Sequence, residues 1–353
     1  MKRFDANKVV VKAKGEYPYI VRTSRNNGQK GYIDEDKQYL NEGNTIAFGQ
    51  DTATMFYQEK PDFTGDKIKV LRSKLSRFNK NNAQFFIVAM RKPFELFSWG
   101  TSSYNVEIIK NQRIVLPVRD GEIDFDFMES FIAELEAERI AELSAYLTVS
   151  GFDNYELSDA ELRALQEYSN LEFNEFDILD IFTVKNTSNL LASDIVENSG
   201  KTPYLCASSE NNGVSSYIEY NKDYLEEGNC IFIGGKTFVV SYQENDFFSN
   251  DSHNLALYLN DSNMRTKLNQ LYITTCVLKS LSHKYSWGNS VSKAKIKCDK
   301  ISLPAKNGRP NFAIMKTFIS AIQKLVIKEV VLYSDRKIAA TKEVISRSYQ
   351  MDD

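Results

Sequence analysis

One stretch of this chain occurs twice, and this repeat constrains the fold more than any other feature. Residues 41–66 read NEGNTIAFGQDTATMFYQEKPDFTGD, and residues 226–251 read EEGNCIFIGGKTFVVSYQENDFFSND. Between residues 18 and 66, 22 of 49 positions are identical to the residue 185 positions later, without a gap. Unrelated segments would give about three identities, so the chain contains an internal duplication.

The repeat continues beyond this core. Phe-Ser-Trp-Gly at 97–100 corresponds to Tyr-Ser-Trp-Gly at 285–288, and residues 114–132 correspond to 301–319. Each copy is therefore a module followed by a helix, and the predicted boundaries are 1–122, 123–170, 171–309 and 310–353. The second module opens with FDILDIF at 176–182, which has no counterpart in the first. Structural roles are predicted for four of the shared residues, namely Gly43, Gly228, Trp99 and Trp287.

Composition fits two ordinary domains. The 353 residues are 42% hydrophobic and 26% charged, enough for two cores. No apolar run approaches the ~18 residues of a membrane span, and MKRFDANK leads into no apolar signal region, so we expect a cytoplasmic protein without a membrane partner. The four cysteines lie only in the second module, which favours buried reduced thiols over a metal site or a disulfide.

Charge is distributed unevenly along the chain. Residues 1–117 carry 20 basic and 12 acidic side chains, 118–170 carry 3 and 14, and 305–353 carry 9 and 5. The two helical segments thus have opposite signs, which favours pairing of the two helices. The alternative is that each apolar stripe packs on its own module.

Local signals predict the main elements. Strands are expected at 19–23 and 31–34 around the turn Asn26-Asn27-Gly28, and at 44–48 and 53–58 around the turn Gly49-Gln50-Asp51. Helices are expected at 84–92 and 268–280. Further strands are expected at 102–109 and 113–116. Long helices should begin at the caps Asp124 and Asn311, and Ser158 with Glu161 forms a capping box in the linker 153–170.

Residues for catalysis are few. His253 and His283 are the only histidines, and neither is repeated in the other module. Gly-Gly-Lys-Thr at 234–237 suggests a phosphate-binding loop, but the required first glycine is Cys230. No nucleophile, nuclease or methyltransferase motif is recognisable. We therefore predict a chain that is not an enzyme, with no catalytic residue, no metal and no cofactor of its own.

The turns differ between the copies while the scaffold is shared. Arg22 corresponds to Ala207, Arg25 to Glu210, Gln50 to Gly235 and Asp51 to Lys236. Such a pattern is typical of two binding surfaces with different targets, although drift on exposed loops would also produce it. The candidate contact residues at these turns are Arg22, Arg25, Asn26, Asn27, Gln50, Asp51, Thr52, Glu210, Asn211, Asn212, Lys236 and Thr237.

The order of motifs resembles a known family. Pro-Tyr, Asn-Asn-Gly, Gly-Asn-x-Ile, Tyr-Gln and aromatic-Ser-Trp-Gly, then Leu-Pro and a helix opening Asp-Phe-x-Phe-Met, resemble the DNA-specificity subunits of type I restriction-modification systems. The segments Gly235–Phe238 and Phe248–Leu255 look closest to the type IIB and type IIG branch. Two features depart from the family: the missing opening of the first module and the shorter helices.

The resemblance implies an α+β fold with two tandem β-rich target-recognition domains, each followed by a long helix, and the helices pairing as an antiparallel coiled coil. It implies a non-catalytic subunit that binds double-stranded DNA, reads a bipartite asymmetric site and positions a DNA adenine methyltransferase subunit, fused to or joined by a nuclease. The candidate turns become DNA-binding residues, and S-adenosylmethionine and magnesium are expected in the partner. The alternative is a duplicated adaptor module that does not bind DNA.

Overall fold

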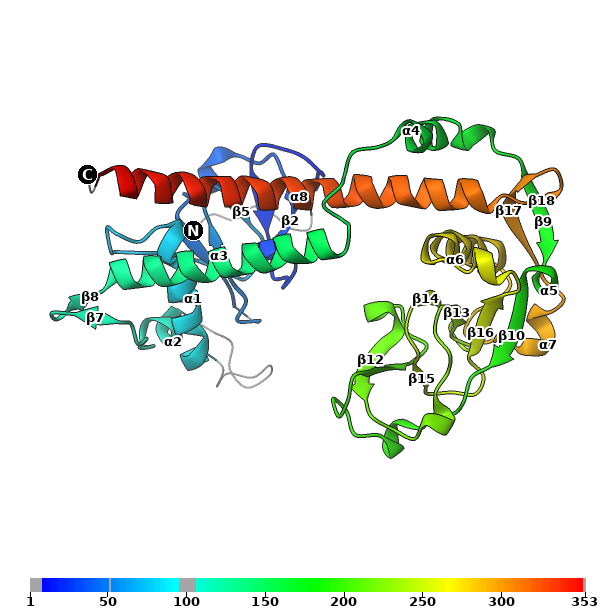
Figure 1. Ribbon diagram of the computed structural model, residues 1–353. Coiled ribbons are helices and arrows are strands. Elements are labelled where there is room, and N and C mark those ends of the chain that lie inside the picture. Colours follow the sequence, from blue (N-terminus) through cyan, green and yellow to red (C-terminus); the bar gives the residue numbers. More distant parts are fainter. Residues whose placement is uncertain (1–7, 51, 95–105, 352–353) are drawn as a thin grey trace. The chain divides into compact units, whose positions relative to one another are not determined.

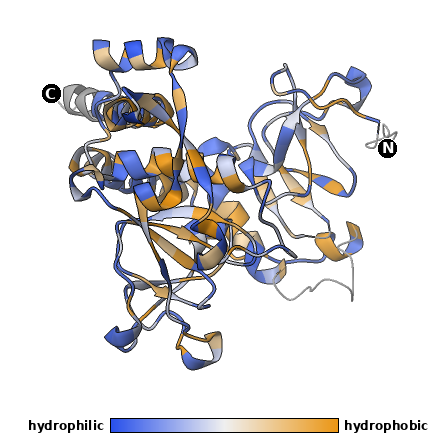
Figure 2. Cartoon of the chain, turned by 90° about the vertical axis from the view of Figure 1, so that its right-hand side faces the viewer, coloured by the Kyte–Doolittle hydropathy of each residue, from blue (hydrophilic) through white to orange (hydrophobic). Residues whose placement is uncertain are grey.

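The computed structural model describes residues 8–50, 52–94 and 106–351. The chain divides into two compact units, residues 1–145 with 336–353, and residues 146–335. Each unit contains one copy of the repeat, and Figure 1 labels many of the helices and strands. In Figure 2 hydrophobic residues follow many of the strands, whereas much of the connecting chain is hydrophilic.

Among its described residues, the first unit contains two three-stranded sheets, a two-stranded hairpin and several helices. One sheet has the order β2-β1-β5 and the other β4-β3-β6. The strands are β1 (Pro18–Ile20), β2 (Gln29–Tyr32), β3 (Thr45–Gly49), β4 (Met55–Gln58), β5 (Phe63–Thr64) and β6 (Ile68–Arg72). They are followed by α1 (Lys80–Phe94), α2 (Val106–Lys110), the hairpin β7 (Val118–Arg119) and β8 (Glu122–Ile123), and α3 (Phe125–Val149).

The core of the first module follows from the alternation of side chains along β3. Ile46 and Phe48 point to one face, where they join Phe86 and Ile87 of α1 in a buried cluster. Phe48 is fully buried, and its ring lies 5.1 Å from that of Phe94. The central sheet is thus fixed to α1 by apolar contacts.

The second unit repeats this plan with additional strands. Its sheets have the orders β10-β16-β13-β14, β12-β11-β15 and β18-β17-β9. The strands are β9 (Phe173–Asp177), β10 (Phe182–Asn186), β11 (Thr202–Leu205), β12 (Val214–Ile218), β13 (Cys230–Ile233), β14 (Val240–Gln243), β15 (Phe248–Ser249), β16 (Leu255–Leu259), β17 (Lys300–Lys306) and β18 (Arg309–Pro310). The helices are α4 (Asp159–Gln166), α5 (Ile178–Ile181), α6 (Lys267–Leu281), α7 (Lys293–Ile296) and α8 (Phe312–Met351), the last of which continues into the first unit.

Both faces of the central sheet in the second module are covered. Ile231 and Ile233 pack with Ile273 of α6 in one cluster. Phe232, on the opposite face of the same strand, packs with Leu205 of the smaller sheet in another. The module therefore has three layers, a helix and two sheets.

The long helices begin at the predicted caps. The backbone N–H of Phe127 donates to Asp124 Oδ1 at 2.9 Å, and that of Ile314 donates to Asn311 Oδ1 at 3.3 Å. Helix α3 has 25 residues and α8 has 40. Within the described residues, no helix is both long and apolar enough to span a membrane.

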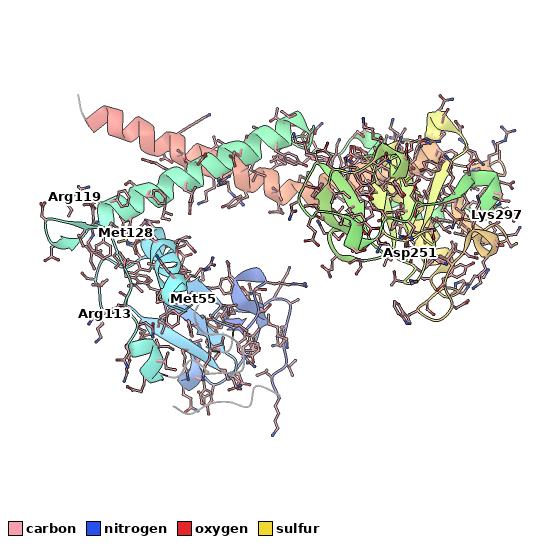
Figure 3. The ribbon with its side chains drawn as sticks, turned by 90° about the horizontal axis from the view of Figure 1, so that it is seen from below. Met55, Arg113, Arg119, Met128, Asp251 and Lys297 are labelled. Atoms are coloured by element: carbon pink, nitrogen blue, oxygen red, sulfur yellow. The ribbon has the colours of Figure 1, made fainter. Side chains whose placement is uncertain are left out.

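The helices pair and also pack on their own modules. In the first unit, α3 and the end of α8 run in opposite directions, and Lys337 Nζ lies 3.2 Å from Glu136 Oε2 (Figure 1). This ion pair joins the acidic helix to the basic one, as predicted. Met128 of α3, labelled in Figure 3, is fully buried in the core with α1. The sequence left open whether the helices pair with each other or pack on their own modules, and α3 does both.

The carboxylate of Glu161 in helix α4 accepts hydrogen bonds from two residues of the N-terminal part of α8. Ser158 and Glu161 form the predicted capping box. Glu161 also accepts hydrogen bonds from Ser320 Oγ at 2.6 Å and Lys324 Nζ at 2.9 Å. Burial alone would raise the pKa of Glu161, but these donors outweigh it and lower the pKa to about 2.

Three local predictions were wrong. Residues 106–109, expected in a strand, form helix α2, and residues 102–105 lie outside the described part. The structure assigns no strand to 113–116, although the corresponding residues in the second module form β17. A strand requires a neighbour, and β17 pairs with β9. Of the four cysteines, Cys230 is buried as expected but Cys298 is exposed.

A buried carboxyl in the first module generates a pH-dependent prediction. Asp62 is 1% exposed, and its Oδ2 has no hydrogen-bond partner. Burial raises the pKa of Asp62 to about 7, against the opposing hydrogen bond from Asn41. In the unfolded chain the carboxyl ionises near pH 4, so between about pH 4 and 7 unfolding releases a proton and stability falls as pH rises.

We expect Asp62→Asn to stabilise the chain at pH 8, by on the order of 1–3 kcal/mol, and to change little at pH 4. Urea unfolding at the two pH values measures this difference. The exposed Asp34, paired with Lys12 at the surface, provides the matched control Asp34→Asn. A stability change of the same size at both pH values would contradict the assignment.

Candidate nucleic-acid interface

Two turns carry the predicted contact residues of the first module. One lies between β1 and β2, and the other follows β3. Gln58 Nε2 donates to the carbonyl of Asn27 at 3.2 Å, which connects the strand after the second turn to the first turn. A Cβ added at Gly49 would lie 3.6 Å from Cγ of Arg22, so the Arg22 side chain rests against the second turn. The structure thus brings the two predicted turns together.

The side chains at these turns are mostly exposed. Arg25 is exposed, and its backbone N–H donates to Thr23 Oγ1 at 3.2 Å. Gln50 is partly buried, and its backbone N–H donates to the carbonyl of Lys67 at 2.8 Å. Thr52 is exposed, whereas Asp51 lies outside the described residues. Arg25 and Thr52 are therefore open to a large ligand.

The second module positions its turns in the same way. Gln243 Nε2 donates to the carbonyl of Asn212 at 3.0 Å, as Gln58 does to Asn27. Thr237 Oγ1 donates to the carbonyl of Ala207 at 3.0 Å, which connects the turn after β13 to the turn after β11. Glu210 and Lys236 are exposed.

The backbone of these turns is the same in both modules. Asn26 and Asn27 have φ values of 47° and 50°, and Asn211 and Asn212 have 47° and 54°. Among L-residues asparagine tolerates this left-handed region best, because its short polar side chain can bond locally. The left-handed backbone at these positions therefore explains why both modules carry Asn-Asn-Gly.

Three of these asparagine amides bond within the protein. Asn26 Nδ2 donates to the carbonyl of Gln29 at 3.2 Å, and Asn211 Nδ2 donates to that of Val214 at 3.0 Å. Asn212 Nδ2 donates to the carbonyl of Tyr242 at 3.0 Å. These contacts hold the turns, and the charged side chains beside them differ between the modules.

Two of the four residues predicted to be structural have a clear steric reason. A Cβ added at Gly43 would lie 2.4 Å from the carbonyl oxygen of Glu59, and one at Gly228 would lie 2.3 Å from the carbonyl carbon of Asn245. Glycine is required where backbones approach this closely. Trp287 is 77% exposed, so its indole is not part of the core, and Trp99 lies outside the described residues.

A charged cluster that was not predicted from the sequence lies beside the turn after β13. Lys236 Nζ lies 3.1 Å from Asp251 Oδ2, and His253 Nδ1 lies 2.8 Å from Asp251 Oδ1. Partial burial alone would raise the pKa of Asp251, but hydrogen bonds from His253 and Lys236 lower it below its ordinary value. Asp251, labelled in Figure 3, is identical to Asp66 in the repeat, and this identity was the available signal.

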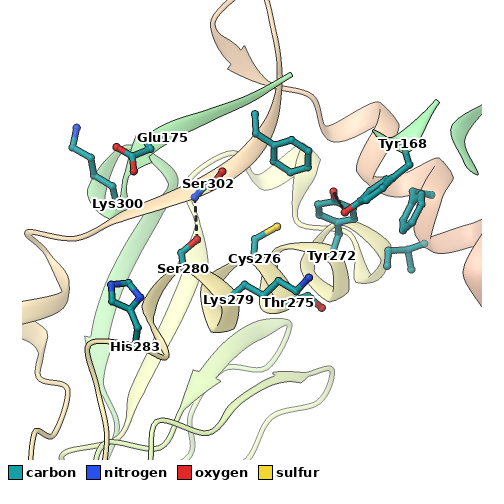
Figure 4. A pocket seen from close by; sticks show the side chains of 13 residues that line it. Tyr168, Glu175, Tyr272, Thr275, Cys276, Lys279, Ser280, His283, Lys300 and Ser302 are labelled. Atoms are coloured by element: carbon teal, nitrogen blue, oxygen red, sulfur yellow. Dashed lines mark hydrogen bonds between the residues drawn. The ribbon is translucent and has the colours of Figure 1, made fainter. Parts of the chain in front are cut away.

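A cavity of about 580 Å³ lies elsewhere in the second unit, between α6, the β9–β17 pair and α8 (Figure 4). Tyr272 and Phe318 line one part of it, and Lys279, His283 and Lys300 line another. None of the predicted contact residues lines this cavity. Across the described part of the chain, no group of three or more His, Cys, Asp and Glu is placed to hold a metal ion.

Comparison with known proteins identifies the class. The family model "Type I restriction modification DNA specificity domain" matches residues 2–145 and 170–332. The chain is 25% identical over 332 residues, 92% of its length, to a Type II restriction enzyme BgcI specificity subunit of Heyndrickxia coagulans, covering 91% of that protein. The S subunit of a type I restriction-modification system from M. genitalium has a similar fold, with a TM-score of 0.54 at 13% identity, over 95% of this chain and 87% of that one.

The fold and the paired turns thus define a duplicated specificity module. The chain belongs to the family of type I restriction modification DNA specificity domains, of which it carries two copies. It is a specificity subunit of a restriction-modification system, the class that the resemblance of its motifs implied, and such a subunit is not itself an enzyme. Family membership favours this interpretation over a duplicated adaptor that does not bind DNA.

The contact of the Asn212 amide predicts an effect on stability. Asn212→Ala removes the bond to the Tyr242 carbonyl and places alanine at a positive φ, so we expect a loss of about 1–3 kcal/mol in the free energy of unfolding. Asn212→Gly, the matched control, tolerates the backbone and should lose less. Urea unfolding measures both. Equal stability of the alanine variant and the wild type would show that the amide does not hold this turn.

Proposed function

We propose that this chain reads a bipartite, asymmetric site in double-stranded DNA and positions a DNA adenine methyltransferase subunit on it. The modules at residues 1–122 and 171–309 each read one half-site. The observation that carries the proposal is the constant backbone of the paired turns, with left-handed asparagines in both copies but different side chains around them. Two different readers on one scaffold would recognise two different half-sites.

The chemistry of the side chains at these turns suits base edges. Arginine forms two hydrogen bonds to guanine, glutamine forms two to adenine, and glutamate accepts from cytosine. Arg22, Arg25 and Gln50 provide the first two types in the first module, and Glu210 provides the third in the second module. Asp51, Thr52, Lys236 and Thr237 complete the proposed contact set, with the four asparagines shaping the turns.

The proposed partner subunit is inferred from the related specificity subunit of Heyndrickxia coagulans. That protein is named as a specificity subunit of a type II restriction enzyme, which supports a methyltransferase fused to or joined by a nuclease. S-adenosylmethionine and magnesium would then be bound by the partner, and the assembly would act in the cytoplasm. The first module carries a net charge of +8 between residues 1 and 117, which suits a polyanionic ligand.

The methylated bases of cells with and without this gene test the proposal. We expect a split adenine-methylated motif that disappears when the gene is deleted. A methylation pattern unchanged by deletion, or methyl transfer by the purified chain without a partner, would contradict it.

The same assay tests the reading residues. Arg25→Ala should relax one base position of one half-site and leave the other half-site unchanged, since a bidentate contact discriminates by about 1–3 kcal/mol. Lys30→Ala, an exposed cation on β2, serves as the control. Uniform weakening across all sequences would make Arg25 a phosphate contact, and relaxation of both half-sites would contradict separate readers.

The helices are proposed to set the gap between half-sites. Four residues added to each of α3 and α8 lengthen them by about 6 Å, which is one or two base pairs. We expect the tolerated gap to grow by that amount with both half-sites unchanged. Substituting four exposed residues without insertion controls for altered helix surfaces, and an unchanged gap would contradict the spacer role.

A further inference from the structure

Trp287 lies at the tip of a tight hairpin in the second module. Residues 285–291 turn through an isolated bridge between Ser286 and Asn289, and Gly288 in this turn has a φ of 119°. A φ of this size favours glycine, so the pair Trp-Gly suits the tip. The Trp287 side chain is 77% exposed and therefore contributes little to the core.

Both ends of the hairpin are anchored to the turn after β13. Before the tip, the ring of Tyr285 lies 5.2 Å from that of Phe238. After the tip, the backbone N–H of the buried Val291 donates to the carbonyl of Gly235 at 3.1 Å. Trp287 is two residues from Tyr285, a span of at most roughly 7 Å. The tip of the hairpin is therefore held beside the turn that carries proposed DNA contacts of the second module.

Side-chain contacts stiffen the hairpin. Asn289 Nδ2 donates to the carbonyl of Lys284 at 2.7 Å, and Lys295 Nζ donates to Asn289 Oδ1 at 2.9 Å. The hydroxyl of Tyr285 donates to the carboxylate of Asp299, which is 3% exposed. A rigid tip can bind through its aromatic side chain with little loss of conformational entropy.

The sequence Ser-Trp-Gly occurs at the equivalent place in both copies of the repeat, at 98–100 and 286–288. A tryptophan required for core packing would be buried, and Trp287 is not. The turns proposed to read bases differ between the copies, so a residue that the copies share suits a feature common to both half-sites. The sugar–phosphate backbone and the faces of the bases are such features, since every base has a π-face.

Lysines are concentrated around the hairpin, in a module that is otherwise acidic. Residues 284–300 contain five lysines and one aspartate, whereas the rest of residues 171–304 contains 7 basic and 15 acidic side chains. Aromatic side chains among cations are typical of nucleic-acid interfaces, where the ring stacks and the cations meet phosphates. The charge therefore favours DNA over a protein partner as the ligand of this hairpin.

Two lysines of this stretch remain for contact with phosphates. Lys284 and Lys300 pair with carboxylates, and Lys295 Nζ donates to Asn289 within the hairpin. Among the described residues, Lys293 and Lys297 form no ion pair. Lys297, labelled in Figure 3, is exposed.

We propose that the indole of Trp287 is a DNA contact of the second module and packs on sugars and base faces beside the half-site without selecting among base sequences. The proposal rests on the proposed function, because the turn after β13 must face DNA for the hairpin beside it to do so. Lys293 and Lys297 contact phosphates on the same side. Trp287 thereby adds affinity common to all sequences, while the turns add discrimination.

The test uses the chain in complex with the co-expressed methyltransferase subunit, and fluorescent duplexes with and without the methylated motif. Trp287→Ala should weaken binding of both duplexes by about tenfold, as for a lost aromatic contact, and leave the ratio of their affinities unchanged. Trp287→Phe keeps an aromatic face and should weaken binding by less than about threefold. Tyr217→Ala, at a 46% exposed aromatic side chain on β12 outside the hairpin, is the matched control and should bind as the wild type does.

The dependence of affinity on salt separates the indole from the lysines. Lys297→Ala removes a phosphate contact and should reduce the slope of log affinity against log salt by about one. Trp287→Ala removes no charge and should leave this slope unchanged. A slope unchanged by Lys297→Ala would overturn the phosphate contact of that lysine.

Equal binding by the wild type and Trp287→Ala would overturn the indole contact, and so would an equal loss with Tyr217→Ala. A changed ratio between the two duplexes would overturn a role that is independent of sequence. A photo-crosslinking residue in place of Trp287 identifies the ligand. Cross-links to DNA support the proposal, and cross-links only to the methyltransferase subunit overturn it.

The wild-type complex separates the failure of this inference from that of the proposed function. If the wild type prefers the motif duplex and Trp287→Ala binds equally well, only the inference about Trp287 fails. If the wild type shows no preference for the motif duplex, the proposed function itself fails.

Discussion

Both modules depend on one antiparallel strand pair, β3 with β6 in the first and β13 with β16 in the second. Because side chains alternate along the central strand, one face packs on a helix and the other faces the smaller sheet. The next strand in each module, β4 or β14, carries a glutamine, Gln58 or Gln243. The side-chain amide of this glutamine donates to the backbone carbonyl of the second asparagine in the turn. The two turns are thereby fixed together by buried contacts. Their exposed side chains are then free to differ.

The surroundings of this strand pair differ between the two modules. The central strands β3 and β13 each have a neighbour on both sides, and among the described residues the second module adds β10 beyond β16. Charged residues on an edge strand discourage indiscriminate pairing. Lys69 and Arg72 place such charges on β6, whereas β16 has Leu255 and Tyr258 at the corresponding positions.

Features controlled by local chemistry could be predicted from the sequence. The Asn-Asn-Gly turns, the caps Asp124 and Asn311 and the capping box at Ser158 are set by residues within a few positions. Features controlled by residues distant in the chain could not be predicted from the sequence. Residues 113–116 have a strand-like sequence, but no strand among the described residues pairs with them as β9 pairs with β17. The contacts of Asp251 with Lys236 and His253 depend on the fold, and only the repeat pointed to Asp251.

The chain has a formal net charge of −3. This negative net charge is compatible with DNA binding because the excess of acidic residues is concentrated in the helical and linker region. Residues 118–170 carry 14 acidic side chains, and two of these are paired with the basic helix, Glu136 with Lys337 and Glu161 with Lys324. Charges paired within the protein contribute little field beyond about a Debye length, ~8–10 Å. The excess of basic residues in the first module therefore governs the field at its own surface, and the distribution of charge matters more than its sum.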